Sequence, residues 1–138
     1  MQLNDQLLIT YECVSAVGTS LDLKKMIEHF LKVFSRKTGA IASIYWEYDA
    51  TKESYTPLCL YGKKSFQPML VPPHKTLSNY TILDDLESGK KLLHVKLKND
   101  WIVFVFHASE QDLSFIKSII SSFSSKLENA ICACKNHL

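Results

Sequence analysis

The four cysteines are the residues of this chain with the greatest capacity for chemistry, because a thiolate can act as a nucleophile or bind a metal ion. They are Cys13, Cys59, Cys132 and Cys134, and none has the spacing of a zinc site. Cys132 and Cys134 are separated by one residue, which on a helix places their side chains about 200° apart. The pattern predicts free thiols. Cys59 with a second thiol is the candidate for redox chemistry, and an inert buried cysteine is the simpler interpretation.

The histidines are the next candidates, as metal ligands or proton carriers. His74 follows two prolines, and His94 and His107 fall in predicted strands. The sequence places no acidic partner or third ligand beside them, so we predict no metal site. No glycine-rich phosphate loop or nucleophile motif occurs either. We therefore predict that the chain is not an enzyme, has no catalytic residue and requires no cofactor.

The bulk composition predicts a globular domain. The 138 residues are 46% hydrophobic and 22% charged, with a formal net charge of +2. Arg36 is the single arginine among 16 basic residues, which argues against nucleic acid as a partner. No apolar run is long enough to span a membrane, and the first residues lack the pattern of a signal peptide. We expect a cytoplasmic location.

The elements that would position these side chains follow from periodicity. Apolar residues at helical spacing predict helices over Asn4–Val17 and Leu21–Lys37, the second ending at Gly39 in the left-handed conformation. Two hairpins are predicted from alternating patterns, over 40–61 and 92–108. Between them, Ser78–Gly89 is predicted as a short amphipathic helix. This order predicts an α+β fold in which helices gather largely on one side of an antiparallel sheet.

Alternation within the strands separates two predicted sheet faces. One face is apolar, includes Ala42, Ile44 and Trp46, and should lie under the helices. The opposite face mixes polar and apolar groups, as a small-molecule pocket requires, although a solvated sheet face has a similar composition. The candidate pocket residues are Ser43, Tyr45, Cys59, Tyr61, His94, Lys96, Val103 and Val105.

The last thirty residues, 109–138, predict a long helix that begins at Ser109 and has no stop signal. Apolar residues recur along it at alternating spacings of four and three, which indicates a coiled-coil seam. We expect this seam to meet a second copy of the chain, while the rest of the apolar face packs on the sheet. The seam residues are Ile116, Ile120, Phe123, Leu127, Ala130 and Cys134.

Two segments resemble those of GAF domains. Residues 19–50 read TSLDLKKMIEHFLKVFSRKTGAIASIYWEYDA, and residues 110–131 read EQDLSFIKSIISSFSSKLENAI. The first is similar to the GAF helix start, "tGA" corner and "aSIY" strand, and the second to the closing helix with its "lenA" tail. The resemblance implies one GAF- or PAS-like domain over 1–138, with an N-terminal helix in 1–20, a core in 21–108 and a C-terminal signalling helix in 109–138.

This resemblance implies a six-stranded antiparallel sheet sandwiched by helices, long terminal helices, and a ligand pocket on one face. It also implies a homodimer through the N- and C-terminal helices and a downstream effector, such as a histidine kinase, a diguanylate cyclase or a transcriptional activator. The NKxnFDE signature of cyclic-nucleotide-binding members is absent from the sequence. The Cys-His pair that holds a bilin and the cysteine arrangement of the free-methionine-sulfoxide reductases are absent as well.

Three functions remain open from the sequence. The first is a non-catalytic sensory domain that dimerises, binds an unknown small molecule and controls a signalling output. The second is an interaction and dimerisation domain without a ligand. The third is a thiol-dependent enzyme of the methionine-sulfoxide reductase type that uses Cys59.

Overall fold

The computed structural model describes residues 3–18, 20–62, 80–85, 89–107 and 114–137. The helices are α1 (Leu3–Ala16), α2 (Leu23–Thr38) and α3 (Ser114–His137). The strands are β1 (Ala42–Asp49), β2 (Ser54–Tyr61), β3 (Tyr80–Asp85), β4 (Lys90–Lys96) and β5 (Trp101–His107). The predicted helix start at Ser109 lies outside the described residues.

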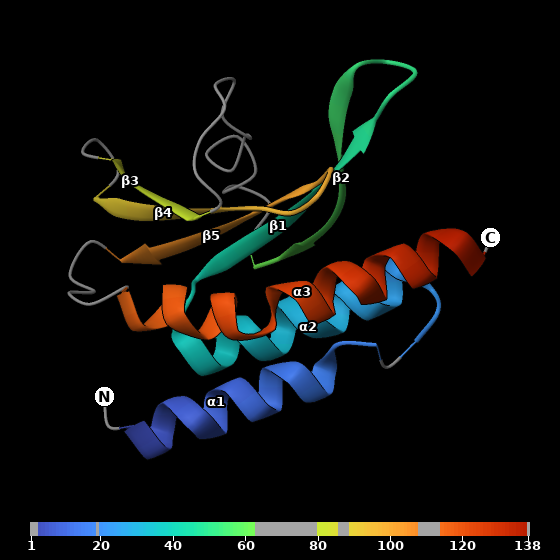
Figure 1. The fold of residues 1–138 in the computed structure, drawn as a ribbon. Coiled ribbons are helices and arrows are strands. Elements are labelled where there is room, and N and C mark those ends of the chain that lie inside the picture. The colour runs from blue at the N-terminus through green and yellow to red at the C-terminus, as the bar shows by residue number, and fades with distance from the viewer. Residues whose placement is uncertain (1–2, 19, 63–79, 86–88, 108–113, 138) are drawn as a thin grey trace.

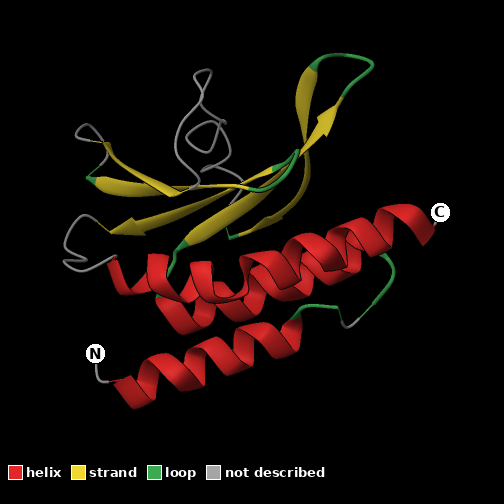
Figure 2. Cartoon of the chain, viewed as in Figure 1, coloured by secondary structure: helices red, strands yellow, loops and turns green. Residues whose placement is uncertain are grey.

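The strands form one antiparallel sheet in the order β2-β1-β5-β4-β3. Helices α2 and α3 lie side by side on one face, and α1 forms a further layer against both of them (Figures 1 and 2). The predicted α+β architecture, with helices gathered on one side, is confirmed. The described residues contribute five strands and place no helix on the other face, so the implied six-stranded sandwich is not confirmed.

Helix α2 follows from local signals at both ends. The Asp22 carboxylate accepts a hydrogen bond from Lys25 N at 3.1 Å and caps the first turn. At the other end Gly39 has φ 82° and donates its N–H to Ser35 O, as the sequence predicts. By contrast, α1 has 14 residues, so the long N-terminal helix implied by the resemblance is not found; α3 has 24.

The short helix predicted over Ser78–Gly89 is wrong. Residues Tyr80–Asp85 form β3, which pairs with β4 in register from Tyr80↔Val95 to Asp85↔Lys90. The segment begins with an aromatic and two β-branched residues, which favour a strand once a neighbouring strand is available. Gly89, with φ 68°, directly precedes β4 in a turn conformation that favours glycine.

The sheet is apolar on both faces. The face toward the helices contributes Leu93, Ile102, Phe104 and Phe106 to the main core with α2 and α3. We call the opposite face the distal face, and its residues form a second buried cluster. That cluster consists of Ala42, Ile44, Trp46, Trp101, Val103 and Val105, with Ile41, Tyr55, Leu60 and Leu92 packed against it.

The predicted assignment of the first hairpin to the sheet faces is therefore wrong. Ala42, Ile44 and Trp46 lie on the distal face, and Tyr45 lies in the main core under the helices. The pairing of β1 with β5 sets this phase, because Ile44 is opposite Val103 and directly opposed side chains share a face. Since five consecutive residues from Ala42 to Trp46 are buried, alternation along β1 carries no information about which face is which.

Candidate functional site

The eight predicted pocket residues do not share one face. Ser43, Tyr45, Cys59 and Tyr61 point toward the helices, where Ser43 Oγ lies 3.0 Å from Ser35 Oγ of α2. Val103 and Val105 belong to the distal cluster. His94 and Lys96 join them, because they pair directly with Val103 and Trp101. The distal face therefore retains half of the predicted set.

His94 is the polar group of the distal face with unmet bonding capacity. Its side chain is only 2% exposed, and its Nδ1 has no hydrogen-bond partner among the described residues. Burial lowers the pKa of the imidazole from 6.5 to about 4, so the ring is neutral near pH 7. A buried nitrogen without a partner is costly and marks a place where a ligand group could bind.

Trp101 is the aromatic neighbour of His94. The two rings meet edge to face, with centroids 6.3 Å apart and an interplanar angle of 81°. The indole Nε1 donates to the Tyr55 hydroxyl at 3.0 Å, which holds the ring in place. The sequence predicted only a hairpin over 92–108 here, and no local pattern indicates the contacts of Trp101 with His94 and Tyr55.

Asp100, immediately before Trp101, lies at the centre of a buried polar cluster. Its carboxylate accepts hydrogen bonds from the Tyr45 hydroxyl and, at 2.9 Å, from Tyr48 N. Lys135 of α3 places its Nζ 2.8 Å from Asp100 Oδ2. Asp100 is 2% exposed, and burial together with this carboxylate raises the pKa of the Tyr45 hydroxyl well above its ordinary value. Sequence reasoning missed this cluster, because its members are far apart in the chain.

The burial of Cys59 disfavours nucleophilic chemistry at its thiol. Cys59 is buried on the helix side of β2, and desolvation raises its pKa to about 12. Cys13 has the same pKa for the same reason. Because the thiolate is the reactive species, both residues are almost entirely in the unreactive thiol form near neutral pH. Cys132 is the exposed cysteine, and all four thiols are free.

The predicted seam of the last helix lies mostly inside the domain's own core. Ile116, Ile120, Leu127 and Cys134 are buried there, and Ala130 packs against it. The side chain of Phe123 lies outside the described residues. The same apolar stripe fits either a twin helix or a domain core, and here it packs in the core cluster shared with α1, α2 and the sheet. The expectation that these residues meet a second copy is not supported by their placement.

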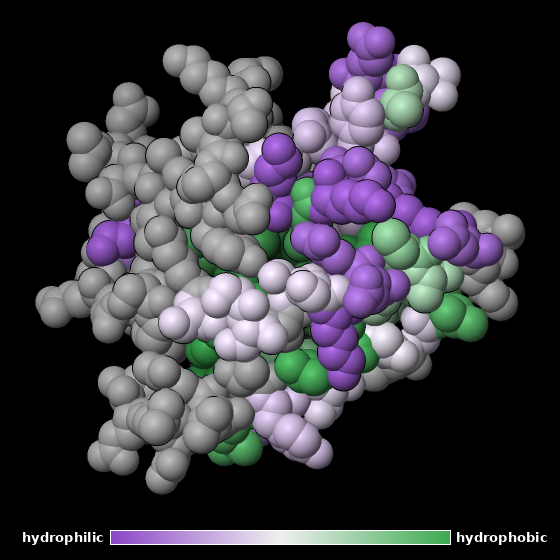
Figure 3. Space-filling view, in the orientation of Figure 1, coloured by the Kyte–Doolittle hydropathy of each residue, from purple (hydrophilic) through white to green (hydrophobic). Residues whose placement is uncertain are grey.

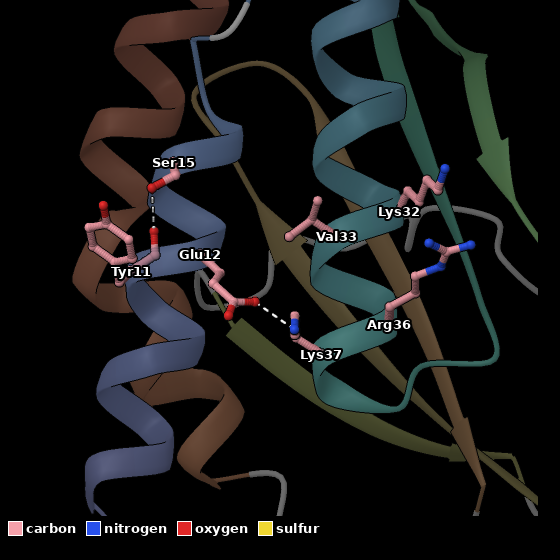
Figure 4. A pocket seen from close by; sticks show the side chains of 7 residues that line it. All are labelled: Tyr11, Glu12, Ser15, Lys32, Val33, Arg36 and Lys37. Atoms are coloured by element: carbon pink, nitrogen blue, oxygen red, sulfur yellow. Dashed lines mark hydrogen bonds and ion pairs between the residues drawn. The ribbon is translucent and has the colours of Figure 1, made fainter.

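A groove between α1 and α2 has a volume of about 430 Å³ and contains none of the predicted pocket residues. Figure 4 shows Glu12 of α1 reaching to Lys37 of α2, an ion pair of 2.7 Å, while Tyr11 points away from α2. Arg36 and Lys32 line the α2 side. A smaller cavity of about 30 Å³ lies beside Asp100, where hydrophilic side chains gather at the meeting of the β4–β5 turn and α3 (Figure 3).

Neither a metal site nor a membrane span is found in the described part of the chain. No group of three His, Cys, Asp or Glu side chains there could hold a metal ion. No described helix is both long and apolar enough to cross a bilayer. His74, the other histidine considered as a ligand, lies outside the described residues.

Solved structures with a similar fold include GAF domains and a reductase. The GAF domain of a phosphoenolpyruvate-protein phosphotransferase from Acinetobacter matches with a TM-score of 0.76 at 10% identity, over 99% of this chain and 97% of that one. Free methionine-R-sulfoxide reductase from Neisseria meningitidis, in complex with its substrate, matches with a TM-score of 0.75 at 9% identity, over 100% and 96% of the two chains. The GAF domain of a putative sensor histidine kinase from Pseudomonas syringae pv. tomato gives 0.66 at 15% identity, over 91% of each chain.

Sequence comparison adds nothing to this likeness. No protein-family model matches the chain, and no curated protein matches it. Identities of 9 to 15% with these structures establish a shared fold and leave function open. The order of elements, the antiparallel sheet and the backing helices agree over nearly the whole chain. The chain therefore has a GAF-like fold.

Proposed function

We propose that this chain is a non-catalytic sensory or regulatory domain that binds a small molecule on the distal face of its sheet. The observation that carries the proposal is His94, a buried imidazole with an unpartnered nitrogen on an apolar face. Such a nitrogen is retained at a cost in stability, and a ligand that bonds to it recovers that cost. The similarity to GAF domains of signalling proteins, a sensor histidine kinase and a phosphotransferase among them, supports a regulatory role.

The chemistry of the face defines the class of ligand. Ile44, Val103 and Val105 are apolar, and the indoles of Trp46 and Trp101 add aromatic surface. The neutral His94 ring offers a single polar contact. We expect a largely apolar, uncharged molecule that places one hydrogen-bonding group against His94.

The proposed domain acts as a homodimer through its N- and C-terminal helices. Leu8 and Tyr11 of α1 are 57% and 70% exposed, and they lie three residues apart on one side of the helix. The middle of α3 presents small, weakly polar side chains that would allow close approach of another helix, pale in Figure 3. These exposed residues of α3 are Ser118, Ser121, Ser122 and Ser125.

The C-terminal segment 109–138 is the proposed route to a downstream effector, such as a diguanylate cyclase, a histidine kinase or a transcriptional activator. Ligand occupancy would shift the domain between two packings of its helices. The reductase with a similar fold raises the alternative of thiol chemistry, but burial and the raised pKa of Cys59 argue against it here. A domain that dimerises without a ligand is the other alternative.

Native mass spectrometry of the freshly purified chain tests the proposal. We expect a dimer in which each subunit carries one bound small molecule, and we expect His94→Phe to lose that molecule while remaining folded. His107→Phe is the matched control, because His107 is an exposed histidine in the neighbouring strand β5. A chain that carries no added mass, and that gains none when incubated with a library of small apolar compounds, would establish the ligand-free alternative.

A further inference from the structure

We propose that Asp100 and Trp101 form a two-sided connector that couples the distal face to the C-terminal end of α3 through Lys135. Successive residues at the start of β5 point to opposite faces of the sheet. Trp101 therefore belongs to the distal cluster, whereas the Asp100 carboxylate meets Tyr45 and Lys135 on the helix side.

On the helix side, Asp100 is held by three elements at once. Tyr45 and Tyr48 donate from β1, Lys135 donates from α3, and the Asp100 carbonyl accepts from Leu97 N at 2.9 Å within the β4–β5 turn. A buried carboxylate with this many donors has few alternative positions, because each lost bond leaves charge unsatisfied. Any displacement of the Asp100 backbone must therefore move Lys135 or break its ion pair.

On the distal side, Trp101 is fixed by two aromatic neighbours. The His94 ring contacts it edge to face, and the Tyr55 hydroxyl accepts from its indole nitrogen. A group that binds His94 must share the space around this indole. Because Trp101 and Asp100 are consecutive residues, a displacement of the Trp101 backbone also displaces Asp100 and its hydrogen bonds on the other face.

The end of α3 packs on the core through Ile131 and Cys134, but among the described residues its further polar contact besides the ion pair is weak. Cys134 Sγ donates to Ser20 O at 3.4 Å, a long contact with a poor donor. Lys135 is partly exposed, with its side chain 32% accessible, so loss of the ion pair can be accommodated without unfolding the core. This coupling would connect a ligand on the distal face to α3. As a signalling route it rests on the proposed sensory function.

The experiment measures coupling without any ligand, so it stays informative even if the distal face proves to bind nothing. The full chain is prepared with 5-fluorotryptophan, and the Trp101 ¹⁹F resonance is assigned with Trp46→Phe. Lys135→Met removes the charge, Lys135→Arg keeps it, and Lys126→Met is the control at an exposed lysine of the same helix. Amide hydrogen exchange over Ile131–Lys135 reports the state of the helix end.

We expect Lys135→Met to shift the Trp101 resonance and to accelerate exchange at the helix end roughly tenfold, because it removes a hydrogen bond to a charged group. Lys135→Arg should preserve both signals, and Lys126→Met should change neither. Coupling is reciprocal, so Trp101→Phe should also accelerate exchange at the helix end, by about threefold or more. The double variant should accelerate exchange by less than the product of the two single effects.

Two results would overturn the proposal. The first is faster exchange in Lys135→Met with an unchanged Trp101 resonance. This result would show that the ion pair stabilises the end of α3 without affecting the distal face. The second is a double variant in which amide exchange accelerates by the full product of the Trp101→Phe and Lys135→Met effects, because the two sites would then act independently. If Trp101→Phe fails to fold, the Lys135 variants decide the question alone through the ¹⁹F resonance.

Discussion

The hydroxyl oxygens of Ser35 on α2 and Ser43 on β1 lie 3.0 Å apart, and both side chains are fully buried. This hydrogen bond joins the helix layer to the sheet at the position where β1 begins. Ser43, paired with Phe104 of β5, accordingly faces α2 and not the distal face. A residue predicted to line a ligand pocket is therefore part of the interior of the domain.

The Ser35–Ser43 pair predicts non-additive stability effects. Ser43→Ala leaves the Ser35 hydroxyl buried without a partner and should lower the free energy of unfolding by about 1–2 kcal/mol. The double variant Ser35→Ala/Ser43→Ala removes both polar groups and should cost less than the sum of the two single changes. Urea unfolding measures both quantities, with Ser125→Ala on the exposed side of α3 as the control. Additive losses would show that the two hydroxyls do not interact.

His94 predicts a specific loss of stability in mild acid. The folded-state pKa is lowered from 6.5 to about 4, so between these values the unfolded chain binds a proton that the folded chain does not. The free energy of unfolding should therefore be highest above pH 6.5 and fall as the pH approaches 4, by about 3 kcal/mol from this group.

Urea midpoints at pH 7.5, 6 and 5 measure this dependence. His94→Phe should remove most of the decline in the urea midpoint between pH 6.5 and 4. His107→Gln, at an exposed position, should show the same decline as the original sequence. An equally steep decline in His94→Phe would assign the loss to other groups.

The thiols predict selective labelling. A maleimide reagent at pH 8 should modify Cys132 within minutes, whereas Cys13 and Cys59 should stay unmodified until the chain unfolds, because both are buried with pKa values near 12. Mass spectrometry of digested, labelled protein identifies the sites, and Cys132→Ser removes the fast reaction. Rapid modification of native Cys59 would reopen the reductase hypothesis.

The terminal helices predict that association and folding respond to different residues. Tyr11→Lys and Leu8→Lys should convert the proposed dimer to a monomer in light scattering while changing the free energy of unfolding by less than about 0.5 kcal/mol, since both side chains are exposed. Ile120→Asp places a charge in the core and should cost more than about 4 kcal/mol, so circular dichroism should show loss of the fold. A folded Ile120→Asp monomer would instead support the predicted seam.

Local signals were sufficient for the elements that depend on nearby residues. Gly39 ends α2 through a contact within four residues, and this limit was predicted from the sequence. The predicted start at Leu21 lies two residues before Leu23, where the helix begins after the Asp22 cap. The hairpins β1–β2 and β4–β5 followed from alternation interrupted by polar turns, and the stripe of α3 predicted a helix. The α+β class needed no more than this, although the predicted order of elements had a short helix in the place of β3.

The tertiary structure decided which side each residue faces and which residues meet. The register between β1 and β2 shifts between Tyr45 and Trp46, and β1 is buried on both sides, so no polar alternation reveals its phase. Segment 80–85 became a strand because β4 offered an edge to pair with. The Asp100 cluster joins residues 35 and 55 positions apart, and such distant contacts leave no periodic trace in the sequence. Hydrophobic periodicity indicates that a side chain is buried. Only the packing of the folded chain determines which residues it is buried against.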